Sequence, residues 1–198
     1  MTPTVDLCNL ALSLVGQSAS ISSVDPPECS VYAHLCAQMY PLALGEMLEQ
    51  HPWGFSTTTQ ELAPLATRPA GFISGFPLPS DCVRVWQVQS HEFGPLIPYE
   101  MRVGESGTMV CTGTETAIVL YTRAIDDPQL LPPAFKMALA HLLASMIAGP
   151  IIKGDTGAKA AAELRKVALS LSTQAATSDA GQKLEVTRVA PVWIRERG

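Results

Sequence analysis

The chain has 198 residues, a formal net charge of −5, and 16% charged against 47% hydrophobic residues. That length suits one domain, or a domain with an insertion, and it is enough to bury a substantial core. An acidic balance with 13 Lys and Arg argues against a reader of duplex DNA, whose affinity comes from neutralising phosphates. The low charged fraction indicates that some apolar surface faces partner subunits.

The N-terminal third predicts two helices. In the first, Leu7, Leu10, Ala11 and Leu14 fall at helical spacing, and Gly16 follows as a C-terminal cap. The second is expected to start at residues 25–28, with Asp25 as the cap, Pro26 in the first turn and Glu28 reaching back to the cap amide.

The second helix is expected to kink at Pro41 and to end before Pro52, because proline removes a backbone donor and restricts the residue before it. Its predicted inward-facing side chains are Tyr32, Leu35, Met39, Leu42, and Met47 or Leu48.

From Phe55 to about Ile125 the apolar period shortens towards two, and Gly and Pro separate short β-branched runs. The best strand candidates are residues 83–89, 97–103, 108–112 and 116–125. They predict a small antiparallel sheet.

Helices are then expected to return. One carries a wide apolar stripe and is expected to stop at Gly149–Pro150; the next is expected to be capped by Asp155 and to fade near Gly181. The predicted inward residues are Phe135, Leu139, Leu142, Leu143, Met146 and Ile147 in the first, and Ala161, Leu164, Ala168, Leu171 and Ala175 in the second. The apolar residues 137–152, interrupted by His141, Ser145 and Gly149, are expected to fall short of a membrane span.

This order predicts an α+β fold, mainly α: a four-helix bundle with an inserted small antiparallel sheet and an extended C-terminal tail. The predicted divisions are a discontinuous helical bundle of residues 1–54 and 126–180, a β insertion of residues 55–125, and a C-terminal docking arm of residues 181–198.

Patterns that suggest catalysis or metal binding are incomplete. GFISG at residues 71–75 has its serine one place too late for a nucleophile elbow. GPIIKGDT at residues 149–156 has Asp155 where a phosphate-binding loop requires lysine. Asp126 and Asp127 precede a proline, which favours a turn, and His141 lies alone on an apolar helix. No catalytic residue, cofactor or metal site is predicted.

The five cysteines are odd in number, and the N-terminus has no basic region of the secretory type, which favours reduced, buried thiols in a cytoplasmic product. They are Cys8, Cys29, Cys36, Cys82 and Cys111. Cys29, His34 and Cys36 lack the paired spacing of a zinc site.

The sequence HPWGF, residues 51–55, ends the second helix. No partner for His51 is evident. The interpretation favoured here is structural: Pro52 stops the helix, Gly54 allows a turn, and Trp53 and Phe55 fold back as anchors.

Three stretches together resemble the tail tubular protein A family, the adaptor or gatekeeper proteins of short-tailed phage connectors. They are CNLALSLVG, then YAHLCAQMYPLALGEMLEQHPWGFSTTTQELA, and later FPLPSDCVRVWQV. The resemblance extends to about Ala176 and is looser in the strands and the tail. The positions that match the family pattern are taken as fold anchors: Asn9, Tyr40, Pro41, Trp53, Phe55, Leu78, Pro79 and Asp81.

The resemblance implies a helical bundle with a β insertion and a ring of subunits, usually twelve, docked between a portal protein and a tail nozzle protein. DNA would pass through the lumen without specific binding, and no catalysis, cofactor or membrane is implied. The location would be the virion connector, after assembly in the host cytoplasm. A head-completion or neck protein of a long-tailed phage, and a cytoplasmic enzyme, remain the alternatives.

The tail, residues 183–198, carries a local charge of +2 against −7 for the rest of the chain. LEVTRV alternates like a strand, and an apolar pair follows a proline, which predicts a docking arm. The candidate docking residues are Arg188, Trp193, Ile194, Arg195 and Arg197.

Overall fold

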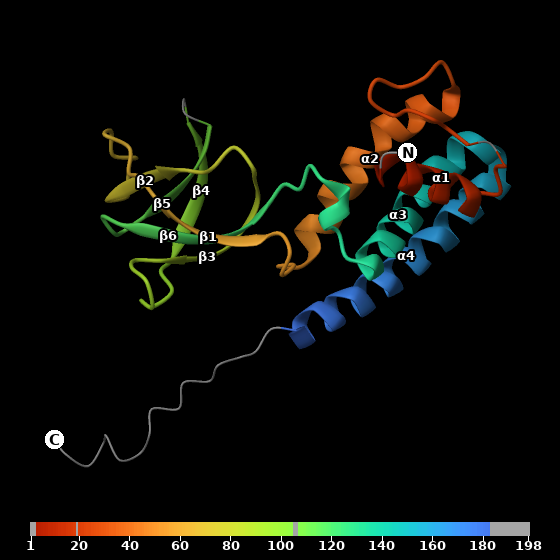
Figure 1. Ribbon diagram of the computed structural model, residues 1–198. Helices are drawn as coiled ribbons and strands as arrows, with labels where there is room; N and C mark the ends of the chain where they lie inside the picture. The colour runs from red at the N-terminus through yellow and green to blue at the C-terminus, as the bar shows by residue number, and fades with distance from the viewer. Residues whose placement is uncertain (1–2, 19, 105–106, 183–198) are drawn as a thin grey trace, which may run out of the picture.

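The computed structural model describes residues 3–18, 20–104 and 107–182. All the strands in this part of the chain lie between Thr57 and Arg123, and the helices come from the chain on either side (Figure 1). With about 47% helix and 23% strand, the fold is mixed α+β. Two separate apolar cores follow from this arrangement, one among the helices and one between the sheets.

Helix α1 (Pro3–Leu14) is fixed to the loop that follows it by one side-chain amide. Asn9 donates from Nδ2 to the carbonyl of Ile21 at 3.0 Å, and its Oδ1 accepts the Ile21 N–H at 2.8 Å. Ile21 is 1% exposed, so few other partners can reach its backbone. Gly16 follows the end of α1 and has a φ of 83°, a conformation that suits glycine.

Helix α2 spans Val31–Gln50, so the predicted start at Asp25–Glu28 is wrong. Ser30 is the N-cap, and its side chain accepts the N–H of Ala33 at 3.0 Å. Glu28 does not reach back to Asp25. Its carboxylate instead accepts the Ser22 N–H at 3.0 Å, which stabilises the preceding loop rather than the helix.

The helix continues through Pro41, whose ring lies on an exposed face. The predicted inward position of Leu42 is wrong, because its side chain is 62% exposed. Of the other predicted inward residues, Met47 and Leu48 are buried, and Tyr32, Leu35 and Met39 pack against the core while partly exposed. The remaining buried residues of α2 are Ala33, Cys36, Tyr40 and Ala43.

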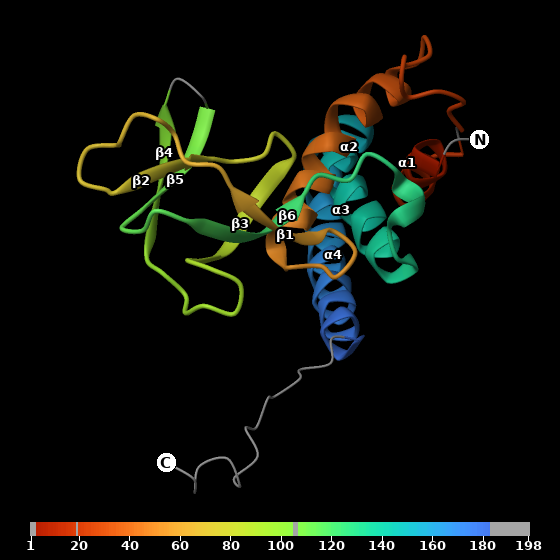
Figure 2. The same cartoon turned by 60° about the vertical axis from the view of Figure 1, so that its left-hand side comes forward.

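Helix α3 (Pro133–Ile152) lies among the other helices, and α4 (Gly154–Gln182) runs along it (Figures 1 and 2). The predicted stop at Gly149–Pro150 is wrong. The carbonyl of Gly149 accepts the N–H of Lys153 at 3.0 Å, so the last turn stays hydrogen-bonded past Pro150. The chain then reverses through Lys153 and Gly154, both with positive φ, and Asp155 lies in the first turn of α4 rather than before it.

The apolar stripe predicted for α3 is buried, with Met146 packed at the edge of the core. By length and composition alone α3, with a mean hydropathy of 1.6, could cross a membrane. The expectation that residues 137–152 fall short of a span stays a prediction, because a buried core helix passes the same test. However, 56% of that apolar window is buried inside the protein. The core of the helical part therefore accounts for much of its apolar surface.

Helix α4 is joined to α2 by polar side chains at positions spaced seven residues apart. Arg165 pairs with Glu46, Ser172 donates to Gln50 at 2.6 Å, and Asp179 contacts His51. A spacing of seven residues returns to the same helix face after two turns. The side of α4 that meets α2 is thus polar, whereas Ala168 and Ala175 are buried in the helical core.

The β part contains two three-stranded antiparallel sheets rather than the single sheet predicted. One has the order β1-β6-β3, with β1 at Thr57–Leu62, β6 at Ala117–Arg123 and β3 at Cys82–Gln89. The other has the order β2-β5-β4, with β2 at Ser74–Pro77, β5 at Gly107–Thr112 and β4 at Tyr99–Gly104. The strands β3 to β6 match the four candidates; β1 and β2 were missed.

The core of the β part lies between the sheets. It consists of Leu62, Phe76, Val88, Val110, Ala117, Val119 and Tyr121. The two parts of the molecule meet where β3 approaches the end of α2. Arg84 donates from Nη1 to the carbonyl of Glu49 at 2.6 Å, and Val83 packs on the helical core.

The Asn9 contact gives a stability prediction. Asn9→Ala leaves the buried Ile21 backbone without both of its partners, so we expect the free energy of unfolding to fall by about 1–3 kcal/mol in urea titrations. Ser13→Ala is the matched control, because Ser13 is exposed on the same helix and its hydroxyl donates to the carbonyl of Leu10, three residues earlier. Equal, small effects of the two changes would contradict a role for Asn9 in holding the loop.

Candidate functional site

The HPWGF turn lies at the junction of three helices and the first strand. Trp53 is 1% exposed, and its indole N–H donates to the carbonyl of Met47 at 2.8 Å. The carbonyl of Trp53 accepts the N–H groups of Ser56 at 3.1 Å and Thr57 at 2.8 Å. One residue therefore fixes both the last turn of α2 and the entry into β1.

Three aromatic rings form the centre of this junction. Trp53 and Phe135 pack edge to face with centroids 4.9 Å apart, and Phe55 packs on Phe135 at 5.0 Å. Phe135 lies in the first turn of α3 and is 1% exposed. Edge-to-face aromatic pairs add stability beyond the area that they bury, so this cluster joins the α2–β1 turn to α3.

His51 has a partner that the sequence analysis did not find. Its Nε2 lies 3.2 Å from Oδ2 of Asp179, in the last turns of α4, and the same carboxylate accepts the Gly54 N–H at 3.0 Å. The side chains of His51 and Asp179 are 23% and 14% exposed. Because 128 residues separate them in the chain, no local spacing could have revealed the pair.

A histidine–carboxylate pair is also part of a catalytic triad, where a nucleophile and an open substrate site lie beside it. The imidazole packs edge to face on Trp53, with centroids 4.9 Å apart. The adjoining cavity measures about 70 Å³ and is lined by Trp53, Pro132, Ala134, Phe135, Ala175, Ser178 and Asp179. Small-molecule sites usually measure roughly 300–1,000 Å³. Through these contacts the pair connects the end of α4 to the turn that follows α2.

The remaining matched positions near the helices differ in their surroundings. Tyr40 is 8% exposed, and burial raises the pKa of its phenol to about 12. Asn9 holds the loop described above. Pro41 is exposed within α2, so the resemblance at this position does not correspond to a core contact.

Leu78, Pro79 and Asp81 form the turn into β3. The carbonyl of Pro79 accepts the Cys82 N–H at 3.0 Å, and the carbonyl of Asp81 accepts the Ala124 N–H at 2.7 Å. The Asp81 carboxylate accepts the Tyr121 hydroxyl at 3.3 Å. These contacts bind the start of β3 to β6 and to the chain that leaves it.

The cysteines are all free, but Cys29 is exposed and Cys82 is half-buried, so the expectation of uniformly buried thiols is wrong. A hydrogen bond with Cys36, together with burial, raises the pKa of Cys8, which remains a thiol at neutral pH. Burial, and then the Asp81 carboxylate, raise the pKa of Cys82 to about 11. Among residues 3–18, 20–104 and 107–182, no group of three His, Cys, Asp or Glu side chains could hold a metal ion.

The candidate docking residues Arg188, Trp193, Ile194, Arg195 and Arg197 lie outside the described residues, as does most of the predicted arm.

Exposed apolar side chains occur on both parts of the molecule, and the sequence analysis did not single them out. Val31 and Leu42 on α2 are 73% and 62% exposed, and Val103 on β4 is 83% exposed. The others are Ile73, Phe93, Leu96, Met101, Leu130, Met137, Val167 and Leu169. The alternation along β4 could have indicated Met101 and Val103, because a strand at the edge of a sheet shows one side chain in two to solvent.

No protein-family model matches the sequence, and the search of curated proteins returned no significant match.

The burial of Trp53 gives a second prediction. Trp53→Ala should lower the free energy of unfolding by about 3–5 kcal/mol, because it removes a buried indole and its packing on Phe135. Trp86→Ala is the control: Trp86 lies half-buried beside Arg84, whose guanidinium is 4.3 Å from its ring centroid. Denaturant unfolding of the two variants should give clearly different midpoints; similar midpoints would show that Trp53 is not central to the junction.

The Asp179 contacts give a third prediction. Asp179→Ala removes the acceptor of the Gly54 N–H, so exchange of that amide with solvent should become faster while the helical core keeps its protection. The expected loss of stability is about 1–3 kcal/mol. Thr177→Ala serves as the control, because Thr177 bonds only within α4. Unchanged exchange at Gly54 would contradict the assignment of Asp179 as the residue that fastens α4 to the turn.

Proposed function

We propose that the chain is a structural virion protein, a ring-forming adaptor that joins a phage portal to the tail nozzle and lines the DNA exit channel. The observation that carries this proposal is the distribution of exposed apolar side chains over both the helical part and the β part. Val31, Leu42 and Val103 are all more than half exposed. A ring subunit needs apolar contact surface on its lateral sides and at its two axial ends.

Two further features support the proposal. The resemblance to the tail tubular protein A family includes HPWGF, and the contacts of that turn are structural: the His51 ring is engaged with Asp179 and Trp53. The finer description of the helices as a four-helix bundle with a spliced β insertion belongs to the same proposal. In it, the bundle comprises residues 1–54 and 126–180 and forms the body of the ring.

The charge of the chain agrees with a channel that conducts DNA. A net charge of −5 disfavours non-specific binding of phosphate, so in the proposed ring DNA passes without specific binding. The resemblance implies a ring of usually twelve subunits. The neighbours of the proposed ring are the portal protein and the nozzle protein. Its location is the virion connector, reached after assembly in the host cytoplasm. The function requires no cofactor, catalytic residue or membrane.

The nearest alternative is a head-completion or neck protein of a long-tailed phage, which would use the same kind of ring. An enzyme is the alternative of a different class. The His51–Asp179 pair is the place at which to test it: a loss of any activity in His51→Ala without a change of stability would favour that class.

Attachment to portal-bearing heads tests the adaptor role. We expect the intact protein to bind purified portal and to show a mass shift, and a chain that lacks residues 183–198 to melt almost normally but to attach poorly. The reason is that this segment carries a net positive charge and an apolar pair, the features of an interface anchor. A stable monomer that never joins portal would contradict the adaptor, whereas full attachment of the shortened chain would contradict only the docking arm.

A further inference from the structure

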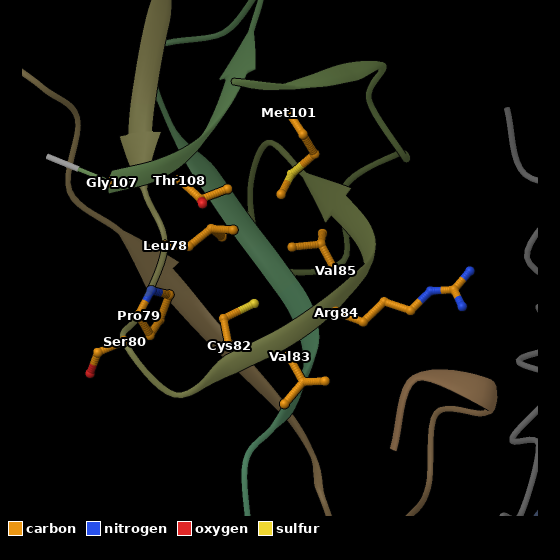
Figure 3. Close-up of a pocket in the computed structure, with 10 residues that line it drawn as sticks. All are labelled: Leu78, Pro79, Ser80, Cys82, Val83, Arg84, Val85, Met101, Gly107 and Thr108. Carbon is orange, nitrogen blue, oxygen red and sulfur yellow. The ribbon is translucent and has the colours of Figure 1, made fainter. Parts of the chain in front are cut away.

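A wedge-shaped cavity of about 400 Å³ opens between β3 and β4 (Figure 3). Side chains from the β2–β3 turn and from strands β3, β4 and β5 point into the same space: Leu78, Cys82, Val85, Met101 and Thr108. Val83 and Arg84 also border it but point away. Most of the side chains that face the space are apolar or carry sulfur. The wedge therefore offers a recess for apolar side chains within the β part.

The course of the two strands explains the wedge. β3 and the chain before β4 run antiparallel and meet at a bridge between Gln89 and Leu96, where the Ile97 N–H donates to Val88 at 2.9 Å. Beyond this bridge they belong to different sheets: β3 pairs with β6, and β4 pairs with β5. β3 also has register shifts between Cys82 and Arg84 and between Val85 and Gln87. Such irregularities bend a strand and increase its twist, so the two strands diverge.

Each side of the wedge is the edge of a sheet. Strands at an edge present N–H and C=O groups that can pair with another chain. Met101 and Val103 on β4 are 44% and 83% exposed, so apolar surface adjoins this edge. An extended peptide that enters the wedge could form main-chain bonds to one edge and place alternate side chains against Leu78, Val85 and Met101.

We propose that this wedge receives residues 184–189 of a second copy of the chain. Their sequence, LEVTRV, alternates as a strand requires, and it lies in the segment after α4 with a local charge of +2 against −7 for the rest. Residue 184 lies two positions after Gln182, the last residue of α4, and residues 183–189 can span about 25 Å when extended, at 3.3–3.6 Å per residue. The choice of a second copy as the source of the segment rests on the proposed ring. The recess and its two strand edges are features of the structure itself and do not depend on that proposal.

The test uses full-length chains with one feature removed at a time. Thr187→Pro removes a main-chain donor from the segment, and Thr187→Ala is its control. Met101→Lys places a positive charge in the wedge, and Met101→Leu is its control. Because Met101 is 44% exposed, the fold should tolerate both changes, and near-UV circular dichroism verifies this.

We expect self-association of the intact chain in sedimentation, with amide exchange of residues 82–85 slowed about tenfold as the protein concentration rises. Thr187→Pro and Met101→Lys should each abolish both effects, and the two controls should keep them. An equimolar mixture of Thr187→Pro and Met101→Lys should again associate, because one copy supplies an intact segment and the other an intact wedge.

Protection that does not depend on concentration, with no recovery in the mixture, would show that the wedge takes the segment of its own chain and would overturn the proposal. Protection that survives Thr187→Pro would overturn it too, by showing that another segment occupies the wedge. Binding of the same variants to purified portal is measured separately. Portal binding without self-association refutes this inference alone, and self-association without portal binding refutes the adaptor alone.

Discussion

The packing of Trp53 is the contact on which the arrangement of the two parts depends. Its ring is buried against Phe135 of α3, its N–H is bound by the last turn of α2, and its carbonyl holds the start of β1. A proline before it and a glycine after it let the chain turn sharply at this point. The direction in which the β part leaves the helices is therefore set by one buried side chain and its neighbours.

The described part of the chain has two apolar cores of different size. The helical core surrounds α3, whereas the sheet core is smaller and is built around Phe76, Val110 and Val119. Between α2 and α4 the contacts are polar, with Arg165, Ser172 and Asp179 at a spacing of seven residues. Pairs of this kind contribute less than apolar burial. The contact of α4 with α2 is accordingly weaker than its contact with α3, and the end of α4 depends on Asp179 for its attachment to the turn.

Because the core of the β part is small, strand edges and apolar side chains of this part stay exposed. A small sheet core buries one face of each sheet and leaves short edges, and the irregular β3 separates from β4 where a continuous sheet would otherwise form. Exposed Val103 and Met101 lie beside this gap. On the helical part, Val31 and Leu42 are exposed on α2, whose buried face combines Ala33, Cys36 and Ala43 with the larger Tyr40, Met47 and Leu48.

The sequence by itself determined the helices and strands with strong periodicity: α1, the stripe of α3, the small residues of α4, and strands β3 to β6. It also determined that the HPWGF turn anchors the end of a helix, because proline, glycine and two aromatic residues restrict the backbone locally. The predicted start of α2 and the predicted end of α3 were wrong, because each depends on which of several groups forms a hydrogen bond. Glu28 binds the Ser22 loop rather than the predicted cap, and the bond from Lys153 to Gly149 carries α3 past Pro150. The polar strand β1, TTTQEL, has no apolar alternation and becomes a strand only by pairing with β6. Only the tertiary structure decided the partner of His51, the separation into two sheets, the exposure of Leu42 and the wedge beside β3. Each of these depends on groups brought together from distant parts of the chain, and local spacing carries no information about such distances.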